Sequence, residues 1–180
     1  MNKLVLLLFR LFGWEIRNSK PSGVRKCVVV MAPHTSNWDF VIGRLAFYLM
    51  GVKGSFLIKK ELFFFPLNII LKALGGIPVD RKIKNNMVKL ASDLFAKSEE
   101  LYLVFTPEGT RKYNPNWKKG FYYIAQQSKV PIALAYIDYP NKVGGFHGVF
   151  IPTGDVNKDI DEIKKILKVF KGKKPENGII

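Results

Sequence analysis

The residues of this sequence best suited to acid–base chemistry are a histidine and an aspartate five positions apart, His34 and Asp39. They follow directly on an apolar run that ends at Met31. Ser36 and Asn37 are good capping residues, so a helix is expected to begin there. The histidine then lies in a loop after a strand, and the aspartate lies in the first helical turn. Across such a turn the carboxylate can reach one imidazole nitrogen, fix the tautomer and raise the basicity of the other nitrogen.

This pair predicts a general base. The sequence has no Ser or Cys in the setting of a nucleophile elbow, so the histidine is expected to activate a hydroxyl group of the substrate directly. The alternative is a structural histidine that caps the following helix. The two residues alone do not decide between these roles.

A second polar loop, Thr106–Arg111, follows the apolar run Leu101–Phe105. Gly109 permits tight backbone geometry, Thr110 offers a hydroxyl, and Arg111 offers a planar guanidinium that suits phosphate. An ordinary polar turn after a strand is the alternative. If the strands before the two loops are parallel, both loops open at the carboxyl edge of the sheet, where open α/β folds bind ligands.

The elements that position these loops follow from short apolar runs that alternate with longer, helix-like stretches. Several runs are continuously apolar, as in strands covered on both faces. The expected strands are Lys26–Met31, Ser55–Ile58, Ile77–Val79, Leu101–Phe105, Ile132–Ile137 and Gly148–Ile151. The expected helices are Asn37–Met50, Leu62–Leu74, Asn86–Ser98, Lys118–Ser128 and Lys158–Lys171, the last with Asn157 as its cap and Gly172 as its stop.

Strands separated by helices predict an α/β fold. We expect a single layer-type domain over residues 1–180, with a mostly parallel central sheet flanked by helices. The tail, residues 173–180, is predicted to be flexible.

The sequence is strongly basic, with 29 Lys and Arg residues against 14 Asp and Glu residues and a net charge of +15. A field of that sign attracts polyanions: nucleic acid, anionic lipid or an acidic carrier protein. The charge alone does not choose among these partners. With two histidines and one cysteine, Cys27, the sequence has no metal-ligand spacing, so no metal site is expected.

The N-terminal segment, residues 1–17, is predicted to form a short amphipathic helix that lies in a membrane interface, because it carries Leu, Phe and Trp with basic residues at intervals. Arg10 interrupts its apolar stretch after six residues and no small-residue cleavage site follows, which argues against a signal peptide. No apolar segment reaches the ~20 residues of a spanning helix, so no transmembrane span is predicted. The alternative is a first helix that packs on the core.

Several short motifs occur in an order that resembles one enzyme family. His34–Asp39 matches an H-x-x-x-x-D motif, Gly75–Arg81 resembles G-x-I-x-x-D-R, and Glu108–Arg111 matches E-G-T-R. Trp117–Gly120 resembles F-K-x-G, and Val130–Ile132 resembles a late V-P-I block. Together, over residues 30–137, these motifs resemble the glycerolipid acyltransferases, in the lysophosphatidic acid (1-acylglycerol-3-phosphate) acyltransferase branch.

This resemblance implies that His34 is a general base, oriented by Asp39, that deprotonates the hydroxyl of a lysophospholipid-type acceptor such as 1-acylglycerol-3-phosphate. The hydroxyl then attacks an acyl thioester, acyl-CoA or acyl-ACP, which is a co-substrate, and no cofactor is implied. The residues implied to hold the acceptor are Arg81, Glu108, Gly109, Thr110 and Arg111, with Lys119 as a further candidate for which a solvated surface role is the alternative. The implied setting is phospholipid biosynthesis, with the enzyme bound peripherally at the cytoplasmic face of an anionic membrane.

Departures from the family pattern leave the acceptor open, and a different lysolipid or a lipid-like amino-acid amphiphile is the first alternative. The departures are Pro33, Pro78, Lys112 and Ala135. The second alternative is a basic, non-catalytic module that binds nucleic acid. Against it, the aromatic residues lie in apolar runs such as Phe63–Phe65 rather than interleaved with Lys and Arg, as a base-stacking surface requires.

Overall fold

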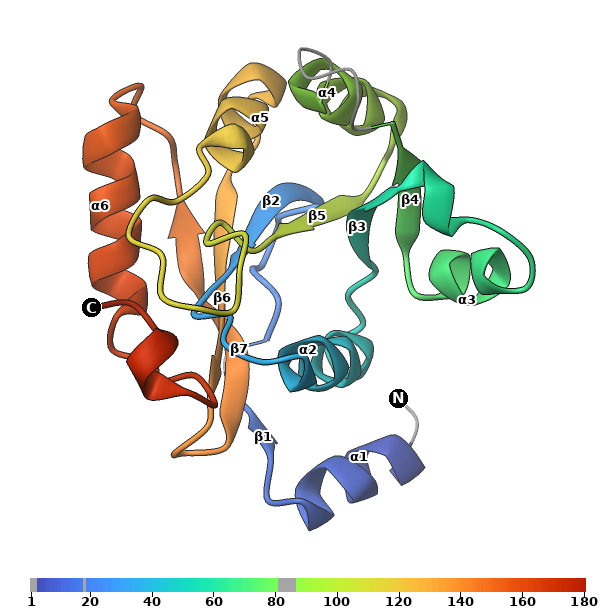
Figure 1. Ribbon diagram of the computed structural model, residues 1–180, viewed down its shortest axis with the longest axis vertical. Helices are drawn as coiled ribbons and strands as arrows, with labels where there is room; N and C mark the ends of the chain where they lie inside the picture. Colours follow the sequence, from blue (N-terminus) through green and yellow to red (C-terminus); the bar gives the residue numbers. More distant parts are fainter. Residues whose placement is uncertain (1–2, 18, 81–86) are drawn as a thin grey trace.

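The computed structural model describes residues 3–17, 19–80 and 87–180, and within them the strands form one seven-stranded sheet (Figure 1). The strands are β1 (Glu15–Ile16), β2 (Lys26–Met31), β3 (Gly54–Lys59), β4 (Gly76–Val79), β5 (Leu101–Phe105), β6 (Ile132–Asp138) and β7 (Val143–Phe150). Their order across the sheet is β1-β7-β6-β2-β5-β3-β4. Neighbouring strands are parallel except β6 and β7, so the predicted mostly parallel sheet is confirmed.

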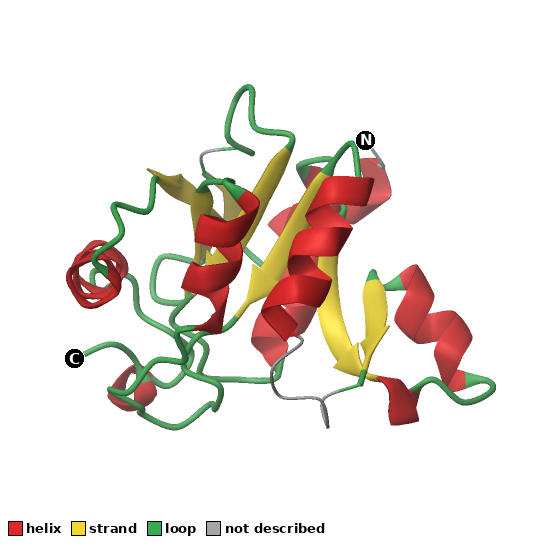
Figure 2. Cartoon of the chain, turned by 90° about the horizontal axis from the view of Figure 1, so that it is seen from above, coloured by secondary structure: helices red, strands yellow, loops and turns green. Residues whose placement is uncertain are grey.

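Helices lie on both faces of this sheet (Figure 2). In the described residues they are α1 (Lys3–Leu11), α2 (Trp38–Leu49), α3 (Leu67–Ala73), α4 (Met87–Lys97), α5 (Gly120–Ser128) and α6 (Val156–Leu167), with 3₁₀ turns at Lys60–Leu62 and Pro175–Asn177. Side chains of α1 and α2 pack on one face, and side chains of α4, α5 and α6 pack on the other. The α/β layer architecture expected from the sequence is therefore present.

The side chains of the central strands alternate between two cores. In β2, Val28 and Val30 belong to the core under α4, α5 and α6. Cys27, Val29 and Met31 of the same strand belong to the core under α1 and α2. Two covered faces explain the continuously apolar sequence, and burying each valine stabilises the fold by about 1.5–3 kcal/mol. The loop with the histidine thus starts from a strand that is anchored on both sides.

Two expected elements are wrong in their extent. The sequence predicts one helix over Leu62–Leu74, but the structure has a 3₁₀ turn and then α3, which begins after Pro66. Proline lacks a backbone N–H and restricts the residue before it, so a helix begins after it but does not run through it. The expected strand Gly148–Ile151 is the end of the longer strand β7, whose first half contains Gly144 and Gly145 and has a weak strand pattern.

The last helix also differs from the expectation in its end and its cap. The last helix ends at Leu167, and the side chain of Asp155, not Asn157, caps it by accepting from the backbone N–H of Lys158 at 3.1 Å. The tail, predicted to be flexible, lies against the loop after β2. The backbone N–H of Lys174 donates to Thr35 Oγ1 at 3.2 Å. The segment is therefore part of the structure around the histidine.

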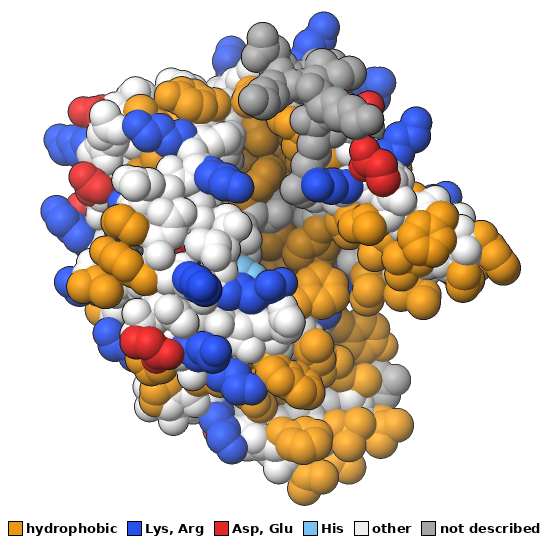
Figure 3. Space-filling model, viewed as in Figure 1, with side chains coloured by type: hydrophobic (Ala, Val, Ile, Leu, Met, Phe, Trp, Pro, Cys, Tyr) orange, Lys and Arg blue, Asp and Glu red, His pale blue; other side chains and the backbone are white. Residues whose placement is uncertain are grey.

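Apolar side chains gather on one side of the molecule, over α1 and α3 and around a hollow between them (Figure 3). We call this the apolar face. Its exposed members are Leu4, Leu7, Leu8, Leu11, Phe12, Leu62, Phe64, Phe65, Ile69 and Ile70. In α1 only Phe9 is buried, and the side chains of Leu7, Leu8 and Leu11 are exposed. No helix in the described ranges is long and apolar enough to cross a bilayer.

Candidate active site

Three neighbouring strands, β5, β2 and β6, bring their loops to the same edge of the sheet. The strands are parallel, so their carboxyl ends meet there. The loop after β2 carries His34, the loop after β5 carries Glu108, and the loop after β6 carries Tyr139. The backbone N–H of His34 donates to Glu108 Oε1 at 3.0 Å, so the predicted meeting of the first two loops is confirmed.

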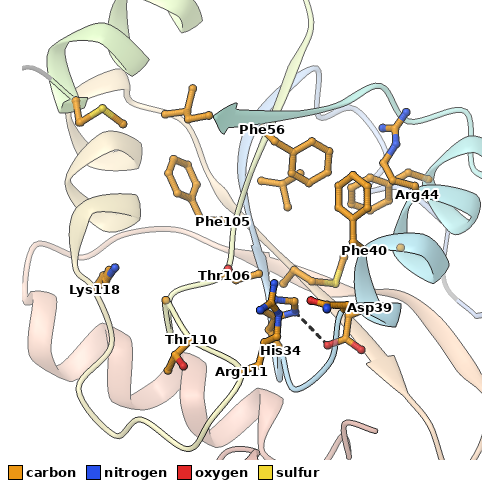
Figure 4. Close-up of a pocket in the computed structure, with 18 residues that line it drawn as sticks. His34, Asp39, Phe40, Arg44, Phe56, Phe105, Thr106, Thr110, Arg111 and Lys118 are labelled. Carbon is orange, nitrogen blue, oxygen red and sulfur yellow. Dashed lines mark hydrogen bonds and ion pairs between the residues drawn. The ribbon is translucent and has the colours of Figure 1, made fainter. Parts of the chain in front are cut away.

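The side chains of His34 and Asp39 are hydrogen-bonded to each other, with 3.0 Å between Nδ1 and Oδ2 (Figure 4). The same carboxylate oxygen accepts from the backbone N–H groups of Thr35 at 2.8 Å and Ser36 at 2.9 Å. Asp39 is in the first turn of α2, so its side chain folds back over the loop that precedes the helix. The expected strand–loop–helix arrangement is therefore what brings the two side chains together.

The charge state of Asp39 follows from its surroundings. The side chain is buried, and burial by itself raises the pKa of its carboxyl. The hydrogen bonds that it accepts, from His34 first, outweigh burial and hold the pKa below its usual value. An ionised carboxylate can only accept, so Nδ1 of a neutral imidazole carries the proton and Nε2 is the acceptor. His34 is thus arranged as a base at Nε2.

The other carboxylate oxygen, Oδ1, accepts from the hydroxyl of Tyr139 at 2.6 Å. Burial, together with this bond to Asp39, raises the pKa of Tyr139, so the phenol stays protonated and stays a donor. Both oxygens of the Asp39 carboxylate are therefore held, one by the histidine loop and one by Tyr139 in the loop after β6.

Glu108 lies under the histidine loop rather than in the open site, and it is 5% exposed. Burial raises the pKa of Glu108 to about 7, against the lowering effect of its bond to the His34 backbone. Its second oxygen, Oε2, is buried without a hydrogen-bond partner in the part of the chain that the structure describes. This carboxyl supports the histidine loop, whereas the resemblance implies that it holds the acceptor.

A cavity of about 1340 Å³ is lined by both residues of the pair and has two unlike parts (Figure 4). Its polar part contains His34, Thr110, Arg111 and Lys118. Its apolar wall consists of Met31, Phe40, Phe47, Phe56, Leu57, Met87, Val104 and Phe105. Gly43 of α2 faces the same space, and a β-carbon there would lie 3.5 Å from Met31 Cε. A base at the boundary of a basic and an apolar surface suits an amphipathic substrate.

Residues 14–137, more than half of the chain, match the sequence model of the family described as Acyltransferase. The chain belongs to the acyltransferase family. This confirms the resemblance indicated by the motifs. The crystal structure of the 1-acyl-sn-glycerophosphate (LPA) acyltransferase PlsC from Thermotoga maritima is similar in fold, with a TM-score of 0.66 and 21% sequence identity over 93% of this chain and 75% of that one. The comparison with curated proteins gave no match.

The E-G-T-R residues of this acyltransferase divide into two roles. Glu108 supports the histidine loop, whereas Gly109, Thr110 and Arg111 line the pocket. Gly109 has a φ of +66°, and a β-carbon there would lie 2.6 Å from Lys118 Cε. Glycine therefore permits both the turn and the approach of the lysine to the pocket.

Two residues that the resemblance places at the acceptor remain, Arg81 and Lys119. Arg81 lies outside the described residues. The amine of Lys119 is exposed and donates to Asn157 Oδ1 at 2.7 Å, which is the surface role named as its alternative. The neighbouring Lys118 lines the pocket instead.

Sequence reasoning missed Tyr139 and Lys118 of this acyltransferase. Tyr139 directly follows the apolar run of β6, so the rule that located the first two loops, side chains at the carboxyl ends of parallel strands, could have located it as well. Lys118 stands beside Lys119, and nothing in the sequence distinguishes the two amines. One amine lines the pocket and the other lies on the surface because the chain turns at these residues, where α5 begins.

Proposed function

We propose that this acyltransferase moves a fatty acyl group from an acyl thioester, acyl-CoA or acyl-ACP, to the hydroxyl of a lysophospholipid-type acceptor such as 1-acylglycerol-3-phosphate, in phospholipid biosynthesis. The observation that carries the proposal is the position of His34, between a basic loop with Arg111 and an apolar wall in one pocket. An acceptor with a charged headgroup and a donor with a fatty chain need these two surfaces on either side of a base.

The reaction begins when Nε2 of His34 takes the proton of the acceptor hydroxyl. The acceptor oxygen bonds to the thioester carbonyl carbon, the C–S bond breaks, and the leaving thiolate takes the proton from the imidazolium. One alcohol and one thioester thus become one ester and one thiol, and the histidine is regenerated. Asp39 stabilises the imidazolium between the two proton transfers, because it is already ionised and bonded to Nδ1.

Arg111 and Thr110 are the groups that we assign to the acceptor phosphate, since a guanidinium and a hydroxyl form charge-assisted hydrogen bonds with phosphate oxygens. The Thermotoga maritima protein with this fold is described as a 1-acyl-sn-glycerophosphate acyltransferase, which supports a phosphorylated acceptor here. The apolar wall then receives the acyl chain, and Phe40 and Phe56, with ring centroids 5.4 Å apart, form one side of it.

We further assign the protein to the cytoplasmic face of an anionic membrane. The apolar face supplies side chains that a bilayer interface can bury, and the net charge of +15 attracts anionic headgroups. The pocket opens beside that face (Figure 3), so a lysolipid can enter with its chain still in the lipid.

The test is an assay of thiol release with purified protein, acyl-CoA or acyl-ACP and a panel of lysolipids with and without phosphate. The His34→Ala variant should lose at least ~10²–10⁴ in rate, because it lacks the general base. Asp39→Asn should also be severely impaired. A folded His34→Ala protein with near-normal transfer would rule out this chemistry, and transfer only to acceptors without phosphate would redirect the proposal to another amphiphile.

A further inference from the structure

The proposed chemistry uses His34 and Asp39. A chain of side-chain contacts continues from Asp39 through Tyr139 to the N-terminal segment. The Tyr139 hydroxyl donates to Asp39 Oδ1 at 2.6 Å. The ring of Trp14 packs edge-on against the Tyr139 ring, with centroids 5.2 Å apart and planes at 87°. Trp14 in turn packs on Phe9, at 6.2 Å, and Phe9 is the buried residue of α1.

Backbone hydrogen bonds hold Trp14 next to Tyr139. The backbone N–H of Trp14 donates to Phe9 O at 3.0 Å, and that of Glu15 donates to Lys142 O at 2.9 Å. β1 also pairs with the start of β7, which follows the turn that contains Tyr139. Trp14 is 9% exposed, so its ring is a packed part of the core rather than a membrane contact.

We propose that Tyr139 is a positioning residue for acyl transfer, acting through Asp39, and that Trp14 holds the tyrosine, so that the N-terminal segment is part of the catalytic apparatus as well as of the membrane surface. The kinetic part of this proposal rests on the proposed function. Without the hydroxyl, Oδ1 would be a buried charged oxygen that has lost its donor, and the carboxylate plane would be fixed from one side only. The imidazole would then be oriented less well.

The kinetic test compares Tyr139→Phe with the parent, using short-chain, water-soluble donor and acceptor so that membrane attachment does not enter. We expect kcat to fall by about tenfold to a hundredfold, as for loss of a hydrogen bond to a charged group, while KM changes by less than about twofold. Tyr102→Phe is the matched control, because it also removes a buried tyrosine hydroxyl, one that donates to Val24 O before β2. Equal kcat values for the parent and Tyr139→Phe would overturn the proposal.

Trp14 is tested with Trp14→Leu, its conservative partner Trp14→Phe and the double variant with Tyr139→Phe. Trp14→Leu should lower kcat, Trp14→Phe should restore most of it, and the double variant should be no slower than Tyr139→Phe alone, because both changes act on one contact. Losses that multiply would show that Trp14 acts independently of Tyr139. Ile151→Ser, at an exposed apolar residue outside the pocket and outside the apolar face, should leave kcat on the soluble substrates unchanged.

A second measurement does not depend on turnover. Histidine labelled with ¹⁵N reports the tautomer of His34 by NMR, and the parent should show the proton on Nδ1, with a mixture of tautomers in Tyr139→Phe. If the parent does not transfer acyl groups yet shows this difference, the proposed function is wrong and the positioning role stands. If the tautomer is the same in both proteins and kcat is the same, the positioning role is wrong and the proposed function stands.

Discussion

At the scale of single residues, Glu108 shows how a group under the site affects the whole protein. Burial raises its pKa to about 7, from 4.5, so between these values the folded protein holds a proton that the unfolded chain has lost. Stability from the neutral carboxyl is therefore fully present below about pH 4.5 and is lost as pH rises through about 7. A side chain of the same shape that cannot ionise should remove this dependence of stability on pH.

Glu108→Gln is the variant that tests this dependence. Its amide oxygen can still accept from the backbone of His34, but it carries no charge. We expect its free energy of unfolding at pH 8 to exceed that of the parent by about 1–3 kcal/mol, with little difference at pH 4.5. Urea unfolding at both pH values measures this. Glu99→Gln, at a carboxylate whose side chain is 92% exposed, is the control, and the same pH response in both variants would contradict the assignment.

Arg111 should act on acceptor binding rather than on the proton transfer. Arg111→Ala is expected to weaken binding of a phosphorylated lysolipid about tenfold to a hundredfold, since a charge-assisted phosphate contact is lost. Acceptors without phosphate should be affected much less. Lys112→Ala removes the same charge from the next residue, which does not line the pocket, and should have little effect on either acceptor. Equal losses with both acceptors would make Arg111 a structural residue.

At the scale of elements, the tail after α6 constrains the histidine loop through Gly172. A β-carbon at Gly172 would lie 2.4 Å from Thr35 Oγ1 and 2.7 Å from Thr35 Cγ2. Thr35 is 2% exposed, and its backbone N–H donates to Asp39, so a displaced threonine disturbs the pairing of His34 with Asp39. Gly172→Ala should therefore lower kcat by at least about tenfold, because small misplacements of reacting groups are costly.

Gly148→Ala in β7 is the control for this prediction, because no atom lies within 4 Å of the β-carbon that it adds. The two variants should be compared for kcat and for melting temperature. Normal turnover by Gly172→Ala would mean that the tail moves aside and does not fix the loop.

The elements also show what the sequence could predict. The bounds of β2 and β5 were predicted correctly, because strands covered on both faces are continuously apolar and end where polar loops begin. The pairing of His34 with Asp39 was predictable because it is local in the sequence. The contact of Tyr139 with Asp39 was not predicted, since it depends on β6 lying beside β2, and strand order is not visible in one sequence. β1 has two residues and is defined by its pairing with β7 rather than by any pattern of its own.

At the scale of the whole molecule, the apolar face and the positive charge should act together in membrane binding. The protein is expected to float with anionic vesicles, to bind less at high salt and to keep a residual attachment there. Salt screens the electrostatic attraction, since the Debye length falls to about 3 Å at 1 M, but it does not screen the burial of Leu and Phe side chains. Flotation at low and high salt measures the two contributions.

Leu7→Ser with Leu11→Ser should remove the attachment that persists in high salt without disturbing the core, because these side chains are 62% and 75% exposed. Val169→Ser, at a residue 66% exposed after α6, is the control and should float like the parent. If the parent binds DNA tightly and does not float with anionic vesicles, the hypothesis of a nucleic-acid-binding module should replace the membrane assignment.

The opening of the pocket beside the apolar face has a kinetic consequence. An acceptor that reaches His34 from within a bilayer arrives by lateral diffusion, and the quantity that governs its encounter with the enzyme is its mole fraction in the lipid surface. Adding inert phospholipid at a constant total amount of acceptor should then slow transfer, although the bulk concentration is unchanged. This effect of surface dilution on the rate should be absent with the short-chain, water-soluble acceptor, which enters the same pocket by diffusion from the bulk solution.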